Sequence, residues 1–112
     1  MYIGIDLGTS SVKILLMSKD GGIVDEVTEE YPVYYPKAGW AEQNPEDWWC
    51  NFKTALSIIK KNNGIDLKSI EAIGISYQMH GLVVVDKKLK SLRPSIIWCD
   101  SRAVDIGDKA FN

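Results

Sequence analysis

The first third of the chain alternates apolar runs with short turns that contain glycine. Residues 2–6, 12–18 and 23–30 have strand-like patterns, and turns at 8–10 and 19–22 separate them. Two short turns that join three strands predict an antiparallel meander.

Prolines and a glycine interrupt this pattern over residues 31–43, which predicts an irregular loop that packs through its aromatic side chains. Asn44-Pro45-Glu46-Asp47 then supplies a capping residue, a proline suited to the first helical turn and two acids favoured at the positive helix start. Apolar residues follow at helical spacing, namely Trp48, Phe52, Ala55, Leu56 and Ile59. We therefore expect an amphipathic helix that ends near Asn62-Asn63-Gly64.

Beyond this helix the pattern predicts more strands. Residues 70–76 are rich in isoleucine, and a strand that follows such a helix is expected to return parallel to an earlier one. Residues 82–85 predict a further strand and residues 86–90 a charged turn. After the apolar residues 96–98, Asp100-Ser101 is a candidate cap for a last helix. This order indicates the opening of a layered α/β domain.

Composition narrows the class of protein. With 112 residues and 46% hydrophobic content, the chain can bury one modest core, as one domain or part of one. The net charge is −2, and the basic residues are scattered among acidic ones, so they offer no basic face for nucleic acid. The start lacks a secretion signal or a membrane span, so we expect a cytoplasmic location and no membrane partner. Cys50 and Cys99 are too few and too far apart for a disulfide framework or a paired metal site.

The stretch with the clearest chemistry is Asp6-Leu7-Gly8-Thr9-Ser10-Ser11-Val12-Lys13. Gly8 allows close approach of the backbone to a ligand, turn N–H groups can point at a phosphate, and the hydroxyls of Thr9, Ser10 and Ser11 add donors. Asp6 can hold Mg²⁺, most simply through water, because that ion keeps much of its hydration. Lys13 faces either a nucleotide or solvent. The plain alternative is a hairpin whose polar side chains satisfy their own turn.

This stretch resembles the first phosphate motif that sugar kinases share with actin and the heat-shock ATPases. The resemblance implies that the hairpin cradles the terminal phosphates of ATP and that Asp6 serves the magnesium ion. It is not the helix-based P-loop, because no GxxxxGK[ST] occurs and the turn leads into a strand.

A second stretch, Ala38-Gly39-Trp40-Ala41-Glu42-Gln43-Asn44-Pro45 followed by Trp48-Trp49, is similar to a signature near the start of the FGGY carbohydrate kinases. It either shapes the sugar side of the cleft or is a loop that Trp40 anchors on the helix. We favour the anchored loop and assign none of these residues to catalysis.

Gly74-Ile75-Ser76-Tyr77-Gln78-Met79-His80-Gly81 resembles the sugar-binding turn of the xylulokinase branch of the FGGY family. Relatives that act on glycerol have an Arg-Glu pair at the positions of Met79 and His80. The resemblance therefore implies that Gln78, Met79 and His80 bind the sugar, and a neutral imidazole and an amide supply the donors and acceptors that hydroxyls need. The alternatives are a structural hydrogen bond for His80 and a packing role for Met79.

Trp98-Cys99-Asp100-Ser101-Arg102 is similar to the Trp-x-Asp-x-Arg stretch of the same family. The face of Trp98 suits the apolar C–H surface of a sugar. Asp100 is a candidate sugar ligand, but an acid that caps a helix and an arginine that braces it are equally good uses of Asp100 and Arg102.

The resemblance runs over essentially the whole chain and implies a ribonuclease H-like, actin-like ATPase fold, with residues 1–112 as the amino-terminal portion of the first FGGY kinase domain. It implies transfer of phosphate from MgATP to a ketopentose, with D-xylulose and D-xylulose 5-phosphate as the expected pair. The general base is expected downstream, so this chain holds no catalytic residue and should be inactive alone. Alternatives are a kinase for glycerol, gluconate or ribulose, or a non-kinase actin-like ATPase module; a homodimer is compatible with either.

Overall fold

A computed structural model describes residues 1–111 of the chain and the side chains of residues 1–110. The chain divides into two compact units. The first unit holds residues 1–31 and 46–78, and the second holds residues 32–45 and those from 79 onward. Each unit has its own sheet.

The first unit contains a four-stranded sheet with the strand order β3-β2-β1-β5. The antiparallel meander expected from the sequence is confirmed in β1 (Tyr2–Leu7), β2 (Ser11–Met17) and β3 (Ile23–Glu30). β5 (Ala72–Tyr77) pairs with β1 in parallel, from Tyr2 opposite Ala72 to Leu7 opposite Tyr77. The predicted parallel return is therefore confirmed, and the carboxyl ends of β1 and β5 lie at the same edge of the sheet.

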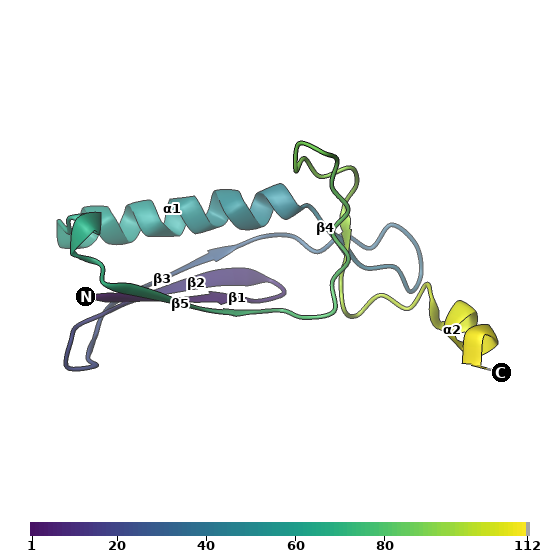
Figure 1. Cartoon of the computed structure of the whole chain (residues 1–112), viewed down its shortest axis with the longest axis horizontal. Coiled ribbons are helices and arrows are strands. Elements are labelled where there is room, and N and C mark those ends of the chain that lie inside the picture. The colour runs from purple at the N-terminus through teal and green to yellow at the C-terminus, as the bar shows by residue number, and fades with distance from the viewer. Residues whose placement is uncertain (112) are drawn as a thin grey trace. The chain divides into compact units, whose positions relative to one another are not determined.

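Helix α1 (Pro45–Asn63) and the short η1 (Leu67–Ser69) precede β5. α1 runs along one face of the sheet (Figure 1) and buries the face that the sequence predicted. Ala55 and Ile59 are buried in it, while Lys60 and Lys61 occupy its exposed last turn. Acidic residues in the first turn and basic residues in the last suit the helix dipole.

The core of the first unit lies between α1 and the sheet. Its buried members are Ile3, Ile14, Leu16, Ala55 and Ile59, each no more than 4% exposed. Alternate residues of β2 face this core, since Val12, Ile14 and Leu16 are fully buried. The intervening positions of β1 and β2, which include Asp6 and Lys13, consequently lie on the sheet face opposite α1.

The second unit has a two-stranded antiparallel sheet of β4 (Glu42–Gln43) and β6 (Ser95–Ile96), and it ends in α2 (Val104–Phe111). The sequence predicted an irregular loop through residue 43. That expectation was wrong for Glu42 and Gln43, which are buried and pair with β6. The local signals of Pro and Gly were overridden by this long-range pairing.

The strand predicted over residues 82–85 was also wrong. Only single bridges form there, from Leu82 to Ile96 and from Val85 to Ser91. The predicted charged turn does form, with the Leu89 N–H donating to the Asp86 carbonyl at 3.0 Å. Each of the residues 82–85 is at least 37% exposed, so burial of apolar side chains does not stabilise a regular strand there.

Among the helices of residues 1–111, none combines the length and the apolar character needed to cross a bilayer.

Candidate functional site

The turn between β1 and β2 is closed by backbone hydrogen bonds. The Gly8 N–H donates to the Ser11 carbonyl at 2.9 Å, and the Tyr31 N–H donates to the Ser10 carbonyl at 3.0 Å. A Cβ atom at Gly8 would lie 3.2 Å from the Ser11 oxygen, closer than a side chain ordinarily packs. The predicted tight turn is therefore confirmed, and its geometry favours glycine at its first position.

The side chain of Tyr31 braces this turn from inside the protein. Its hydroxyl lies 2.5 Å from the Gly8 carbonyl oxygen and 2.8 Å from that of Ser11, and the residue is 5% exposed. Burial, with a smaller effect of the Asp6 charge, raises the pKa of Tyr31 to about 12. The hydroxyl therefore keeps its proton and remains a donor at neutral pH. The sequence analysis missed Tyr31, because no local pattern signals a tyrosine that reaches back over twenty positions.

Asp6 and Lys13 are directly opposite each other in the β1–β2 ladder, and Ser76 is opposite Asp6 in β5. Residues opposite each other in a ladder share a face, so these three side chains form one polar row. Asp6 is exposed, and the Lys13 ammonium lies 3.1 Å from the Glu26 carboxylate. The row presents an accessible carboxylate beside the Gly8–Ser11 turn.

A single exposed carboxylate fits a particular kind of metal site. Among the residues that the structure describes, no three His, Cys, Asp or Glu side chains lie together as a set of metal ligands. Mg²⁺ suits one carboxylate, because it keeps several waters and takes its other ligands from substrate phosphates.

Gln78, which follows β5, is joined to the same turn. Its backbone N–H donates to the Leu7 carbonyl at 2.8 Å, and its side-chain Nε2 donates to the Gly8 carbonyl at 3.3 Å. The first residue of the predicted sugar-binding turn and the predicted phosphate turn therefore meet at the carbonyl of Gly8.

The other predicted sugar-site residues belong to the second unit. Met79 and Trp98 are exposed, and His80 has a positive φ of 60°. A positive φ is uncommon for a residue with a side chain, although histidine is among those that tolerate it. His80 stands two residues before Leu82 and Trp98 two residues after Ile96, so both flank the bridge between those residues.

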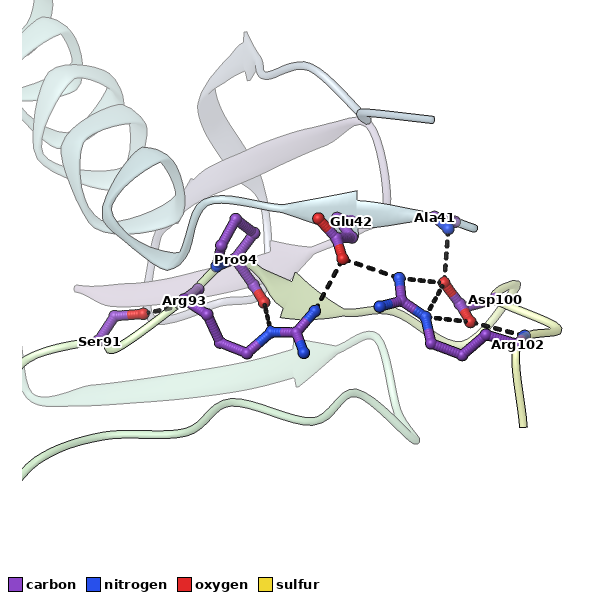
Figure 2. Close-up of polar contacts among 7 residues, drawn as sticks. All are labelled: Ala41, Glu42, Ser91, Arg93, Pro94, Asp100 and Arg102. Carbon is purple, nitrogen blue, oxygen red and sulfur yellow. Dashed lines mark hydrogen bonds and ion pairs between the residues drawn. The ribbon is translucent and has the colours of Figure 1, made fainter. Parts of the chain in front are cut away.

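An ion-pair cluster joins the two stretches of the second unit that resemble family signatures (Figure 2). The Arg102 side chain donates to both oxygens of Asp100 and, at 2.8 Å, to Glu42. Arg93 donates to the same Glu42 oxygen at 2.8 Å. Since Asp100 also accepts from the Ala41 N–H at 2.6 Å, this cluster fastens residues 41–42 to residues 100–102.

Trp40 and Gly39 extend the same contact. The Arg102 guanidinium lies 3.6 Å from the centre of the Trp40 ring, a cation–π geometry. The Ser101 N–H donates to the Gly39 carbonyl at 2.8 Å, and a Cβ atom at Gly39 would lie 2.5 Å from the Ser101 hydroxyl. Gly39 also has a φ of 74°, so both the space and the backbone conformation require glycine there. Trp40 packs on Arg102 in this structure, and the sequence analysis missed the ion-pair partners Glu42 and Arg93.

Asp100 does not cap a helix, because α2 begins only at Val104. Its side chain is 2% exposed and is saturated by Arg102 and Ala41. The hydrogen bonds from Arg102 hold the pKa of the Asp100 carboxyl well below its usual range. Of the uses considered for Asp100 and Arg102, these contacts favour bracing.

The first unit defines the class of protein. A meander whose first turn follows an exposed acid, continued by a helix and a strand parallel to the first, is the opening of an actin-like ATPase fold. Residues 1–110 match the N-terminal domain of the FGGY family of carbohydrate kinases, and the chain belongs to that family. The resemblance and the fold class expected from the sequence are confirmed.

Relatives of known name cover almost all of the chain. It is 43% identical over 105 residues to the xylulose kinase of Klebsiella pneumoniae, covering 94% of this chain and 21% of the relative. It is 35% identical over 105 residues to the glycerol kinase of Leptospira biflexa serovar Patoc, covering 93% and 21%. A crystal structure of ligand-bound xylulose kinase from Lactobacillus acidophilus matches with a TM-score of 0.90 at 32% identity, covering 99% of this chain and 22% of that one. The chain spans about a fifth of the length of the curated relatives it matches.

Replacement of Asp100 by asparagine should change how stability depends on pH. The pKa of this carboxyl is lower in the folded than in the unfolded state, so the charged form stabilises the fold above the ordinary value of 3.8. That stabilisation is lost as the pH falls below 3.8. Urea unfolding should therefore show Asp100→Asn less stable than the wild type near neutral pH, with a difference that shrinks below about pH 4.

The exposed Asp105 gives the matched control, since Asp105→Asn makes the same chemical change on the surface of α2. It should lower the free energy of unfolding at neutral pH by less than Asp100→Asn does, because the Asp105 carboxylate is exposed. A stability difference for Asp100→Asn that stays constant from neutral pH to about pH 2 would contradict the ion-pair account.

Proposed function

We propose that this chain is part of an ATP-dependent kinase that phosphorylates a ketopentose, with D-xylulose as the substrate and D-xylulose 5-phosphate as the product. The observation that carries this proposal is the junction at Gly8, where the candidate phosphate turn is hydrogen-bonded to Gln78 of the candidate sugar turn. Phosphoryl transfer depends chiefly on positioning and charge stabilisation, so a fold that joins the two turns suits it.

In this proposal the Gly8–Ser11 turn binds the phosphates of ATP, with N–H and hydroxyl donors from Thr9, Ser10 and Ser11 and positive charge from Lys13. Asp6 holds the hydrated Mg²⁺, which neutralises phosphate charge when bound. The sugar oxygen bonds to the γ-phosphorus as the bond to the ADP oxygen breaks, and a base outside this chain takes the hydroxyl proton. Residues 1–112 alone are therefore proposed to be inactive.

The sugar side is assigned to Gln78, Met79, His80 and Trp98. The positive φ of His80 supports this, because strained backbone conformations gather at functional sites. Asp100 is assigned an indirect role, as the residue that holds the segment after Trp98 against Ala41. The alternative of a polyol substrate rests on the similarity to the Leptospira glycerol kinase.

The proposal is tested with the full-length protein, MgATP and a panel that contains D-xylulose, D-ribulose, gluconate and glycerol. We expect ADP release that requires a sugar, with the highest kcat/KM for D-xylulose. A higher kcat/KM for glycerol would favour the polyol alternative. ATP hydrolysis that no sugar stimulates would instead favour an actin-like ATPase without kinase activity.

Replacement of Asp6 by asparagine in the full-length enzyme should lower kcat on the order of 100-fold, because a group that positions the metal carries several kcal/mol of transition-state stabilisation. The KM for the sugar should stay close to wild type. Asp20→Asn is the control, since Asp20 lies in the turn between β2 and β3, at the other end of the hairpin. Turnover by Asp6→Asn as fast as by Asp20→Asn would remove Asp6 from the metal site.

Replacement of His80 by glycine separates its two roles, because glycine adopts a φ of 60° without strain. If the imidazole bonds a sugar hydroxyl, His80→Gly should raise the sugar KM and cost about 1 to 3 kcal/mol in kcat/KM. The ATP KM and the melting temperature should change little. Leu89 has a φ of 63°, so Leu89→Gly is a matched control that should leave the sugar KM unchanged. A drop in stability with parallel losses of ATP and sugar binding would instead make His80 a brace of its loop.

A further inference from the structure

The Tyr31 hydroxyl occupies an unusual position for a side chain that belongs to no recognised motif. It follows β3, the third strand, yet it reaches the turn between the first two strands and approaches two of that turn's carbonyls. One hydroxyl carries one proton, so it can donate fully to only one of the oxygens of Gly8 and Ser11 at a time. The hydroxyl nevertheless lies within hydrogen-bond distance of both ends of the turn.

The direction of the Gly8 carbonyl also sets the direction of the N–H group that follows it. In a planar trans peptide the C=O and the following N–H point in opposite directions. Donation from Tyr31 and Gln78 to the Gly8 oxygen therefore fixes the direction of the Thr9 N–H. The Tyr31 N–H acts in the same way on the peptide between Ser10 and Ser11. It donates to the Ser10 carbonyl oxygen and so fixes the direction of the Ser11 N–H. Two of the turn's N–H groups are oriented by one residue.

We propose that Tyr31 is a positioning residue that pre-orders the Gly8–Ser11 turn for the phosphates of the nucleotide. This inference rests on the proposed function, because it takes that turn as the phosphate site. A pre-ordered turn binds without first losing conformational entropy, so the hydroxyl contributes to nucleotide affinity although it contacts no phosphate. Its raised pKa keeps it a donor throughout the pH range in which such an enzyme is assayed.

The test is Tyr31→Phe in the full-length kinase, which removes the hydroxyl and keeps the ring. Gln78 still donates to Gly8 in this variant, so the turn should loosen without being lost. We expect the ATP KM to rise about tenfold, the equivalent of one unmade buried hydrogen bond, with a sugar KM at saturating ATP close to wild type. Tyr35→Phe is the matched control, because Tyr35 is 71% exposed and should change neither constant.

The outcomes separate this inference from the proposed function. If the wild type phosphorylates a sugar and Tyr31→Phe has the ATP KM of Tyr35→Phe, the positioning role is wrong while the kinase proposal stands. Equal rises in the ATP and sugar KM, with a lower melting temperature, would make Tyr31 a general structural residue and also overturn the role. A wild type that neither binds ATP nor phosphorylates any sugar would overturn both proposals.

Hydrogen exchange of the wild-type protein is a second test of this role, and it does not require that any variant folds. The amides of Gly8 and Tyr31, which donate to the Ser11 and Ser10 carbonyls, should exchange slowly before nucleotide is added, because the turn is already closed. Fast exchange of these two amides without nucleotide, followed by protection only after MgADP is added, would show that the nucleotide itself orders the turn and would overturn the role of Tyr31.

Discussion

The parallel pairing of β1 with β5 is the constraint on which the candidate site of the first unit depends. Parallel strands bring their carboxyl ends to the same edge of a sheet, so the residues after Leu7 and those after Tyr77 are neighbours although seventy positions separate them. A parallel pair needs a long crossover, and α1 supplies it. The burial of Ala55 and Ile59 against Ile14 and Leu16 keeps that crossover in place.

The two faces of the sheet have different roles, because successive side chains along a strand point to opposite faces. One face of β2 is fully buried at Val12, Ile14 and Leu16, which stabilises the hairpin by removing apolar area from water. The other face of the hairpin carries Asp6 and Lys13, which remain accessible because α1 covers the opposite side. The same alternation that builds the core therefore leaves an exposed carboxylate beside the turn.

In the second unit, ion pairs hold distant segments together, as apolar packing does in the first unit. Arg102 is flanked by Trp40 on one side and bonded to Asp100 and Glu42, all with little exposure. A buried guanidinium needs such partners, because an unpaired buried charge costs several kcal/mol. The cluster thus makes two irregular stretches, around residues 40 and 100, depend on each other.

Local sequence was enough to predict the elements whose apolar pattern repeats or whose ends are marked by proline, acidic residues or glycine. The alternation of β2, the proline and acids at the start of α1 and the glycine turns predicted the meander and the helix nearly to the residue, because those signals act through neighbours in the chain. The acid and hydroxyl-rich turn also indicated phosphate chemistry. Tertiary structure alone decided that Glu42 and Gln43 form a strand, that residues 82–85 do not, and that Asp100 binds Arg102 and Ala41 and caps no helix. It likewise brought Tyr31 and Gln78 to Gly8. The pairing of Glu42 and Gln43 and the bonds that join Asp100 to Ala41, and Tyr31 and Gln78 to Gly8, connect residues from twenty to seventy positions apart. No local pattern specifies which distant partner satisfies a hydrogen bond.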